Sequence, residues 1–305
     1  MELHIFDFDG TIFNSPVPSV RLRRVHGAKI FGELMRPLAD KGAGWFQSLS
    51  TLSPPAVPRK PEVKEWYVLS TLDKLKVLEE QKGTPVEPGC PSPVDVCVLT
   101  GRDEKFRGRI EEILDNAGLL SVVSKLFLKP HETYGTVKYK LEVFTALITE
   151  KRPRHVYYYE DRVDQGMKLL EGVRLLFSAA NRDNSSGVSI FVGMVDSKGG
   201  RCAPLCLRPL VVTARKTTCA VLVKHWWGAT CRQFDSDFSG LLPFSFTLVL
   251  IDPSSCLRCE QMLSAEEEDA LVAQLMSERD SYRASNPRIS SGSRGPFRRE
   301  AGHRK

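Results

Sequence analysis

The sequence predicts an α/β protein in which a parallel sheet is covered by helices on both faces. Short apolar runs alternate along the chain with segments whose apolar residues recur every three to five residues, the spacing of a helix. The strongest apolar runs lead into glycine or acidic residues, as buried parallel strands do where they meet a loop. Strands that alternate with helices are typical of a parallel sheet lying between helical layers.

Three strong strands are expected, at residues 3–8 (LHIFDF), 94–100 (VDVCVLT) and 155–159 (HVYYY). Residues 126–128 and 189–195 supply two weaker candidates. Helical spacing lies between these strands, in the segment that begins after Asp103 and in residues 140–147 and 167–173.

Residues 14–93 interrupt this alternation. The segment is rich in proline, contains Trp45 and Trp66, and has helical character near residues 62–80. Because about 80 residues of pure loop are unusual inside a domain, we interpret it as an inserted cap. The two tryptophans form the core of the cap or stack on a nucleobase, and the sequence leaves both options open.

A domain boundary is predicted after residue 195, at the polar, glycine-containing stretch DSKGGR. Residues 196–280 then form a smaller α+β accessory domain, with strands near residues 210–213, 219–224 and 246–252. Ser264 and Glu267 form a capping box that begins a helix through about Ser277. Residues 281–305, rich in Ser, Gly and Arg, are expected to be a disordered basic tail.

Composition narrows the protein class. The chain has 305 residues, of which 42% are hydrophobic and 26% charged, as in globular proteins. No apolar run approaches the ~20 residues that span a bilayer, and the N-terminus lacks a secretory signal. We therefore expect an intracellular protein, cytoplasmic or nuclear, that is neither secreted nor embedded in a membrane.

Charge and cysteine are both concentrated near the C-terminus. The formal net charge is +6, and residues 282–305 hold seven basic side chains against one acidic one. Three roles of this tail stay open: it binds phosphate backbones, it is a nuclear localisation signal, or it only makes the chain more soluble. Two cysteine pairs have the spacing of a zinc site, although the apolar neighbours of Cys202, Cys206, Cys256 and Cys259 favour buried thiols.

Polar groups follow each of the three strong strands. Asp7 and Asp9 come with the first strand, Thr100 and Gly101 end the second, and an acidic pair, Glu160 and Asp161, ends the third. Ligands of open parallel sheets bind at the carboxyl ends of the strands, where these groups meet. Carboxylates together with a substrate phosphate are the ligands that Mg²⁺ prefers.

These segments resemble the motifs of the haloacid dehalogenase (HAD) superfamily of phosphatases. Asp-Phe-Asp-Gly-Thr (7–11) resembles the first motif, Val-Leu-Thr-Gly-Arg (98–102) the second and Glu-Asp-Arg (160–162) the fourth. Over residues 1–195 the chain is most similar to the Swiss Army Knife RNA repair-like HAD domain, and more distantly to the 3′-phosphatase module of polynucleotide kinase/phosphatases. The resemblance implies a HAD-like Rossmannoid fold and a phosphate on RNA, such as a 3′ end, as the substrate.

The resemblance also implies roles. Asp7 is the nucleophile that forms an aspartyl-phosphate, and Asp9 is the acid and base. Thr100 and Gly101 bind the phosphoryl group. The expected Mg²⁺ ligands are Asp7, Asp9 through its backbone carbonyl, and Asp161, with Glu160 beside or behind the ion. Glu160 stands where the polynucleotide phosphatases have aspartate, which weakens its assignment as a ligand.

The third motif requires a lysine that neutralises phosphate charge. Lys140 fits best, because its segment is expected to be a helix that opens onto the site, and Lys138 and Lys129 are the alternatives. The sequence has neither the GxxxxGK[ST] loop of a kinase nor the KxDG of a nucleotidyl ligase. Two other functions stay open, a non-catalytic scaffold that binds RNA or protein, and a phosphatase of small metabolites.

Overall fold

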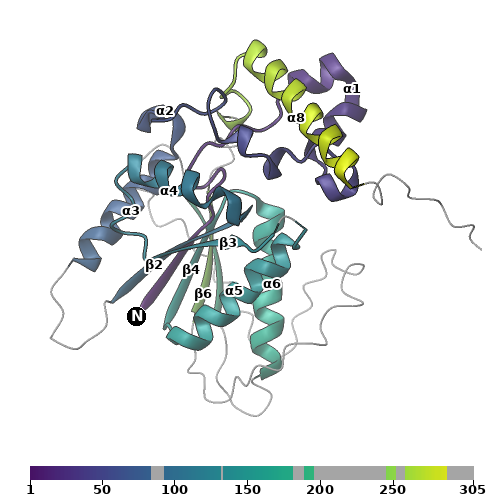
Figure 1. The fold of residues 1–305 in the computed structure, drawn as a ribbon. Helices are drawn as coiled ribbons and strands as arrows, with labels where there is room; N and C mark the ends of the chain where they lie inside the picture. Colours follow the sequence, from purple (N-terminus) through teal and green to yellow (C-terminus); the bar gives the residue numbers. More distant parts are fainter. Residues whose placement is uncertain (84–92, 132, 181–188, 196–244, 252–257, 287–305) are drawn as a thin grey trace, which may run out of the picture.

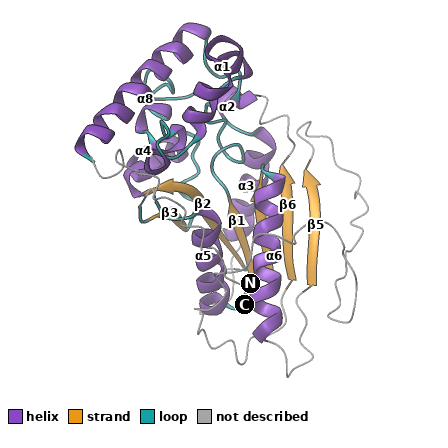
Figure 2. Ribbon diagram, turned by 90° about the vertical axis from the view of Figure 1, so that its right-hand side faces the viewer, coloured by secondary structure: helices purple, strands orange, loops and turns teal. Residues whose placement is uncertain are grey.

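A computed structural model describes residues 1–83, 93–131, 133–180, 189–195, 245–251 and 258–286. Its centre is a six-stranded sheet in the order β3-β2-β1-β4-β6-β5, in which every neighbouring pair is parallel (Figure 2). The predicted parallel α/β architecture is confirmed, and the fold is Rossmann-like. The strands are β1 (Glu2–Phe6), β2 (Val94–Asp103), β3 (Lys125–Lys129), β4 (His155–Glu160), β5 (Ser189–Val195) and β6 (Ser245–Ile251).

Helices cover both faces of the sheet (Figure 1). Alternate residues of each strand point to opposite faces, so Val96 and Val98 of β2 join one apolar core while Cys97 and Leu99 join the other. The first core includes α3 (Leu69–Lys82) and α4 (Arg107–Asn116). The second includes α5 (Thr136–Lys151) and α6 (Val163–Ala180).

The segment between β1 and β2 is divided between two parts of the molecule. Its last helix, α3, packs on the sheet, so the inserted part is shorter than the predicted 14–93. Before α3, the insert has a separate apolar core built around Trp45. Its elements are α1 (Val20–Met35), α2 (Val63–Trp66) and three 3-10 helices, η1 (Leu38–Asp40), η2 (Trp45–Gln47) and η3 (Leu49–Thr51).

Both tryptophans are buried. Trp45 is 0% exposed and its Nε1 donates to the carbonyl of Pro16, and Trp66 is 6% exposed and stacks on Phe13. Neither ring is available to a nucleobase. Both rings serve packing, but only Trp45 lies in the insert's own core, whereas Trp66 joins the apolar core of the sheet.

The C-terminal half of the chain does not form the separate unit that is predicted for residues 196–280, as far as it is described. Residues 245–251 are β6, which lies in the main sheet between β4 and β5. The physical reason is that the open edge of β4 needs hydrogen-bond partners, and the apolar β6 supplies them. The strands expected at residues 210–213 and 219–224 lie outside the described residues.

The second described part is α8 (Ala265–Ser285), which packs on the insert. Leu271, Val272 and Leu275 enter the core around Trp45. The capping box of Ser264 and Glu267 is confirmed, but the helix continues past the predicted end at Ser277. It takes in the first residues of the predicted tail, and residues 287–305 lie outside the described ranges.

Polar contacts fix α8 to the insert. Glu268 is buried, and its carboxylate accepts hydrogen bonds from the amide and hydroxyl of Ser19 and from Arg21 Nε. Glu278 accepts hydrogen bonds from the hydroxyls of Ser48 and Ser50. We call residues 14–66 together with α8 the α1–α8 layer. Among the described helices, none has the length and apolar character that a membrane crossing needs.

His4, a buried histidine of the sheet, is expected to make the folded protein less stable in acid. His4 on β1 hydrogen bonds to the Tyr159 hydroxyl at 3.0 Å and stacks on Tyr157. Burial, then the charge of Lys74, lowers its pKa to about 4 against the opposing effect of Glu2. Between pH 6.5 and 4 the unfolded chain therefore binds more protons than the folded one, so this residue lowers the stability as the pH falls, by about 3 kcal/mol in all.

The measurement is urea unfolding between pH 7 and 4.5 for the wild-type protein and for His4→Phe. The variant is expected to lose less of its unfolding free energy over this window. Parallel pH dependences for the two proteins would contradict the assignment.

Candidate active site

The carboxyl ends of the central strands bring the predicted polar groups together. Phe6 of β1 pairs with Val98 of β2 on one side and with Tyr159 of β4 on the other. The residues that follow these three are therefore neighbours at one edge of the sheet. They include Asp7, Thr100, Glu160 and Asp161, all of which are buried.

Three of these carboxylates form a compact cluster. Asp7, Glu160 and Asp161 each offer an oxygen, and the three atoms lie within 4.8 Å of one another. Burial, and after it the negative charge of Glu160, raises the pKa of Asp161 to about 8. Burial also raises the pKa of Asp7 to about 6, against the opposing charge of Lys140. The raised values come from burial and from repulsion between the carboxylates, and a bound cation would offset both effects.

Of the three candidate lysines, only Lys140 contacts the nucleophile candidate. It lies in α5, is 0% exposed, and places Nζ 2.9 Å from Asp7 Oδ1 and 3.3 Å from Glu160 Oε2. Its Nζ also donates to the Tyr158 hydroxyl at 2.8 Å. Lys138 is largely exposed and lies 4.0 Å from Glu142, and Lys129 donates to the carbonyl of Tyr134.

Glu160 is held from several sides. Its Oε2 accepts hydrogen bonds from the Tyr158 hydroxyl and Gln165 Nε2, both at 2.7 Å, and from Lys140. Its Oε1 accepts one from the backbone amide of Arg162. Burial opposes ionisation, but Lys140 and Arg162 hold the Glu160 pKa well below its usual range. With both oxygens engaged, Glu160 fits a position behind a metal ion, where it orients Lys140.

Asp9 is clamped by Arg102 of β2. Arg102 Nε and Nη2 donate to Asp9 Oδ1 at 2.9 and 2.8 Å, and Nε lies 3.1 Å from Oδ2. Arg102 is itself buried, donates to Thr51 Oγ1 of the insert and lies over the Phe106 ring. Despite burial, Arg102 lowers the Asp9 pKa. An ionised Asp9 can act as the predicted base. To act as the predicted acid, it must first take up a proton.

Of the remaining predicted groups, Thr100 and Gly101 lie in the last part of β2 and Gly10 lies in the turn after β1. Thr100 is buried, and its Oγ1 accepts a hydrogen bond from the Arg102 amide. A Cβ at Gly101 would lie 2.9 Å from Thr136 Cγ2 of α5. Gly10 has φ +73°, and a Cβ there would lie 2.3 Å from Asp161 Oδ2. A glycine at position 10 is what allows the first turn to touch the acidic cluster.

We expect Gly10→Ala to lower the unfolding free energy by about 2 kcal/mol or more, because the left-handed backbone and the contact with Asp161 both oppose a Cβ. Gly118→Ala is a matched control, since Gly118 has φ +70° and a methyl group added there would meet no heavy atom within 4 Å. Urea unfolding of the two variants measures the difference. Equal losses would show that the contact with Asp161 costs nothing.

Two arginines of the motifs make contacts that the sequence pattern does not indicate, Arg102 on Asp9 and Arg162 on Asp7. Arg162 lies over Asp7, with Nη2 3.3 Å from Asp7 Oδ2 and Nε 3.5 Å from Glu160 Oε1. Its side chain is 46% exposed, whereas that of Asp7 is 1% exposed. A phosphate therefore reaches Asp7 only when Arg162 moves aside or takes hold of it.

A cavity of about 670 Å³ lies directly above these groups. Its floor includes Asp9, Gly10, Asp161 and Arg162, and its roof comes from the α1–α8 layer. Cys259, one of the predicted zinc ligands, is buried and also lines it, while the other three cysteines lie outside the described residues.

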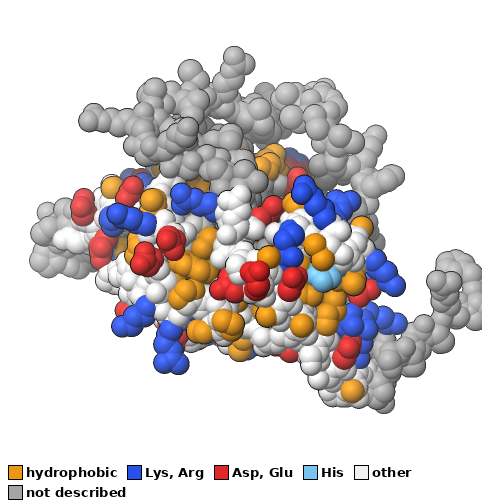
Figure 3. Space-filling model, turned by 90° about the horizontal axis from the view of Figure 1, so that it is seen from above, with side chains coloured by type: hydrophobic (Ala, Val, Ile, Leu, Met, Phe, Trp, Pro, Cys, Tyr) orange, Lys and Arg blue, Asp and Glu red, His pale blue; other side chains and the backbone are white. Residues whose placement is uncertain are grey.

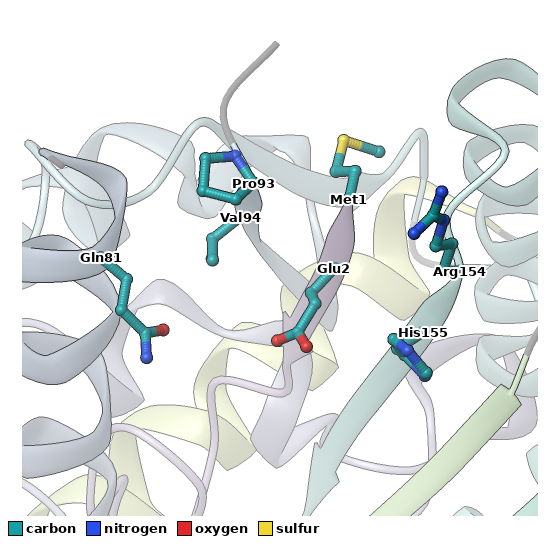
Figure 4. A pocket seen from close by; sticks show the side chains of 7 residues that line it. All are labelled: Met1, Glu2, Gln81, Pro93, Val94, Arg154 and His155. Atoms are coloured by element: carbon teal, nitrogen blue, oxygen red, sulfur yellow. The ribbon is translucent and has the colours of Figure 1, made fainter. Parts of the chain in front are cut away.

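A second, more open cavity of about 480 Å³ lies at the opposite edge of the sheet, where β1, β2 and β4 begin (Figure 4). Its polar residues are Glu2, Gln81, Arg154 and His155, and no cluster of carboxylates gathers there among the described residues. The acidic cluster and the motif residues therefore lie beside the first cavity.

A scan of the chain against protein-family models finds no match.

Proposed function

We propose that this protein is a Mg²⁺-dependent phosphomonoester hydrolase of the HAD type, with Asp7 as its nucleophile. The observation that supports it best is the buried Lys140, which bridges Asp7 and Glu160 beside Asp161 at the carboxyl ends of the strands. Such a cluster is costly to bury and contributes little to stability by itself. Perturbed carboxylates gathered beneath a cavity are instead typical of a catalytic site.

Charge balance supports a metal ion in this site. The three clustered carboxylates outnumber the two cations that contact them, Lys140 and Arg162, and Asp9 is neutralised by Arg102. A phosphate dianion would add two negative charges to this site, and a divalent cation that binds with it would cancel them. Asp7 and Asp161 would hold Mg²⁺ with the Asp9 carbonyl, and Glu160 would support them from behind. When bound, Mg²⁺ would neutralise charge on the transferred phosphoryl group.

The chain's own residues account for the rest of the reaction. Asp7 attacks phosphorus, the ester oxygen leaves, and an aspartyl-phosphate forms. Asp9 supplies the proton to the leaving oxygen and later takes one from the water that hydrolyses the intermediate. Lys140 keeps Asp7 ionised and oriented, and Thr100 and Gly101 line the phosphoryl position. The resemblance favours a phosphorylated RNA end as the substrate.

Figure 3 views the α1–α8 layer from above, and acidic, basic and apolar side chains are interspersed there. No continuous basic surface covers the described part of this face. We therefore propose that the protein recognises only the phosphorylated end of an RNA strand, inside the cavity. A non-catalytic scaffold is the second candidate, and the burial of Asp7 beneath Arg162 is the observation that favours it.

The test is phosphate release in Mg²⁺ and in EDTA, from an aryl phosphate, from glycerol phosphate, and from 3′- and 5′-phosphorylated oligoribonucleotides. Mg²⁺-dependent release from the 3′-phosphorylated RNA supports end processing. Release from the small esters alone supports a metabolite phosphatase. A folded protein that releases no phosphate from any of the four contradicts the hydrolase and supports the scaffold.

A further inference from the structure

The cavity above the acidic cluster has two unlike walls. The α1–α8 layer contributes an apolar wall that includes Phe31, Met35 and Phe46. Another part of the lining is the polar loop that leads from β3 into α5, with Lys129 and residues 133–136. The floor carries the groups that would hold the phosphate. A ligand that fills the cavity therefore needs an apolar part, a hydroxyl-bearing part and an anionic end.

The aromatic wall is fixed before any ligand binds. Phe31 and Phe46 are both half-buried and pack against the core that is shared by Trp45, Leu34 and Leu275. Rings that are held from behind lose little side-chain freedom when a ligand covers their other side. They offer a preformed surface for a planar group.

We propose that the leaving group of the phosphoester is a nucleoside whose base packs on Phe31 and Phe46. This inference rests on the proposed function and names its substrate class, a nucleotide with a terminal phosphate. A volume of about 670 Å³ lies within the range of sites that enclose whole small molecules, so a bare phosphate or a glycerol ester leaves most of it to water. The polar loop faces the sugar, and a lipid-like leaving group would be mismatched against it.

Phe31 is the better of the two rings to test. The Phe46 ring lies 5.7 Å from the guanidinium carbon of Arg102, which holds Asp9, so its removal affects every substrate. Phe31 has no described contact with the catalytic groups. Phe31→Leu keeps an apolar side chain and removes the planar ring, and Phe31→Ala removes both.

The experiment measures binding by calorimetry in Mg²⁺, with Asp7→Asn protein so that no turnover occurs. The ligands are adenosine 3′-monophosphate, adenosine 5′-monophosphate and glycerol phosphate. We expect at least one nucleotide to bind about tenfold or more tightly than glycerol phosphate, and Phe31→Ala to weaken nucleotide binding about tenfold, the usual effect of losing one stacking contact. The nucleotide affinity of Phe31→Leu is expected to lie between those of the protein with Phe31 and of Phe31→Ala. Val25→Ala, on the exposed face of the same helix, is the control.

Equal affinities for the nucleotides and glycerol phosphate would overturn the inference, as would nucleotide binding that Phe31→Ala leaves unchanged. Because binding is measured without turnover, this outcome is separate from that of the proposed function. Nucleotide binding that depends on Phe31, in a protein whose wild-type form releases no phosphate, would support the binding site and contradict the hydrolase.

Discussion

Replacing Asp7 with asparagine is expected to reduce Mg²⁺-dependent phosphate release by at least about a thousandfold. An amide does not form the aspartyl-phosphate, and no other described carboxylate occupies the same position at the end of β1. The fold should persist, because asparagine has nearly the same shape and keeps an oxygen beside the Lys140 ammonium, which lies 2.9 Å from Asp7 Oδ1. Phosphate release and circular dichroism of the same preparation measure the two effects.

Asp73→Asn makes the same chemical change on the exposed surface of α3 and serves as the control. It should retain wild-type turnover. Activity that survives in Asp7→Asn at a comparable level would remove Asp7 from the role of nucleophile, whatever the substrate proves to be.

Replacing Lys140 with methionine is expected to have the largest effect on stability. Lys140 is the buried cation that contacts both Asp7 and Glu160, so its loss leaves buried carboxylates without their counter-charge. Breaking a buried ion pair in this way costs about 3–5 kcal/mol. Phosphate release should also be lost, since Asp7 is no longer held ionised and in place. Urea unfolding at pH 8 gives the change in unfolding free energy.

The pH dependence identifies the cause of that loss. Without Lys140 the pKa values of the buried carboxylates rise, so the folded variant binds more protons than its unfolded chain and gains stability as the pH falls. The deficit relative to wild type should therefore be smaller at pH 5 than at pH 8. Lys138→Met, at an exposed position of the same helix, should stay within about 0.5 kcal/mol of wild type. A similar loss in both variants would contradict the argument.

The site was predictable where its residues are marked by local pattern. Asp7, Thr100 and Glu160 each stand at the end of an apolar run, and parallel strands place their carboxyl ends on one side of the sheet. The side of the sheet was therefore predictable, and the pairing of β1 with β2 and β4 brings the three residues together. Lys140 is favoured over Lys138 because it is expected in a helix that opens onto this edge, and it is the lysine that contacts Asp7.

The remaining contacts depend on packing that local pattern does not encode. The Arg102 clamp on Asp9 requires a fixed side-chain path past Phe106 and Thr51. Tyr158 supports Lys140 and Glu160 from inside the sheet, and only its place two residues before Glu160, on the same side of β4, signals that role. The sequence did not predict that β6 pairs with β4 or that α8 packs on the insert. Both partners lie in the C-terminal part of the chain, and a local pattern does not say which distant segment it pairs with.

The place of β6 has a consequence for how the protein is made. The ribosome completes β1–β4 first, yet the second edge of β4 is covered only when residues 245–251 emerge, about 90 residues after Glu160. At ordinary elongation rates the nascent sheet waits roughly 5–18 s with that edge open. Throughout this interval the strand that carries Glu160 lacks one neighbour, and α8, which packs on the core around Trp45, is made later still. The sheet beneath the candidate site is therefore complete only after residues 245–251 have been made, and chaperones that shield open sheet edges would act before that point.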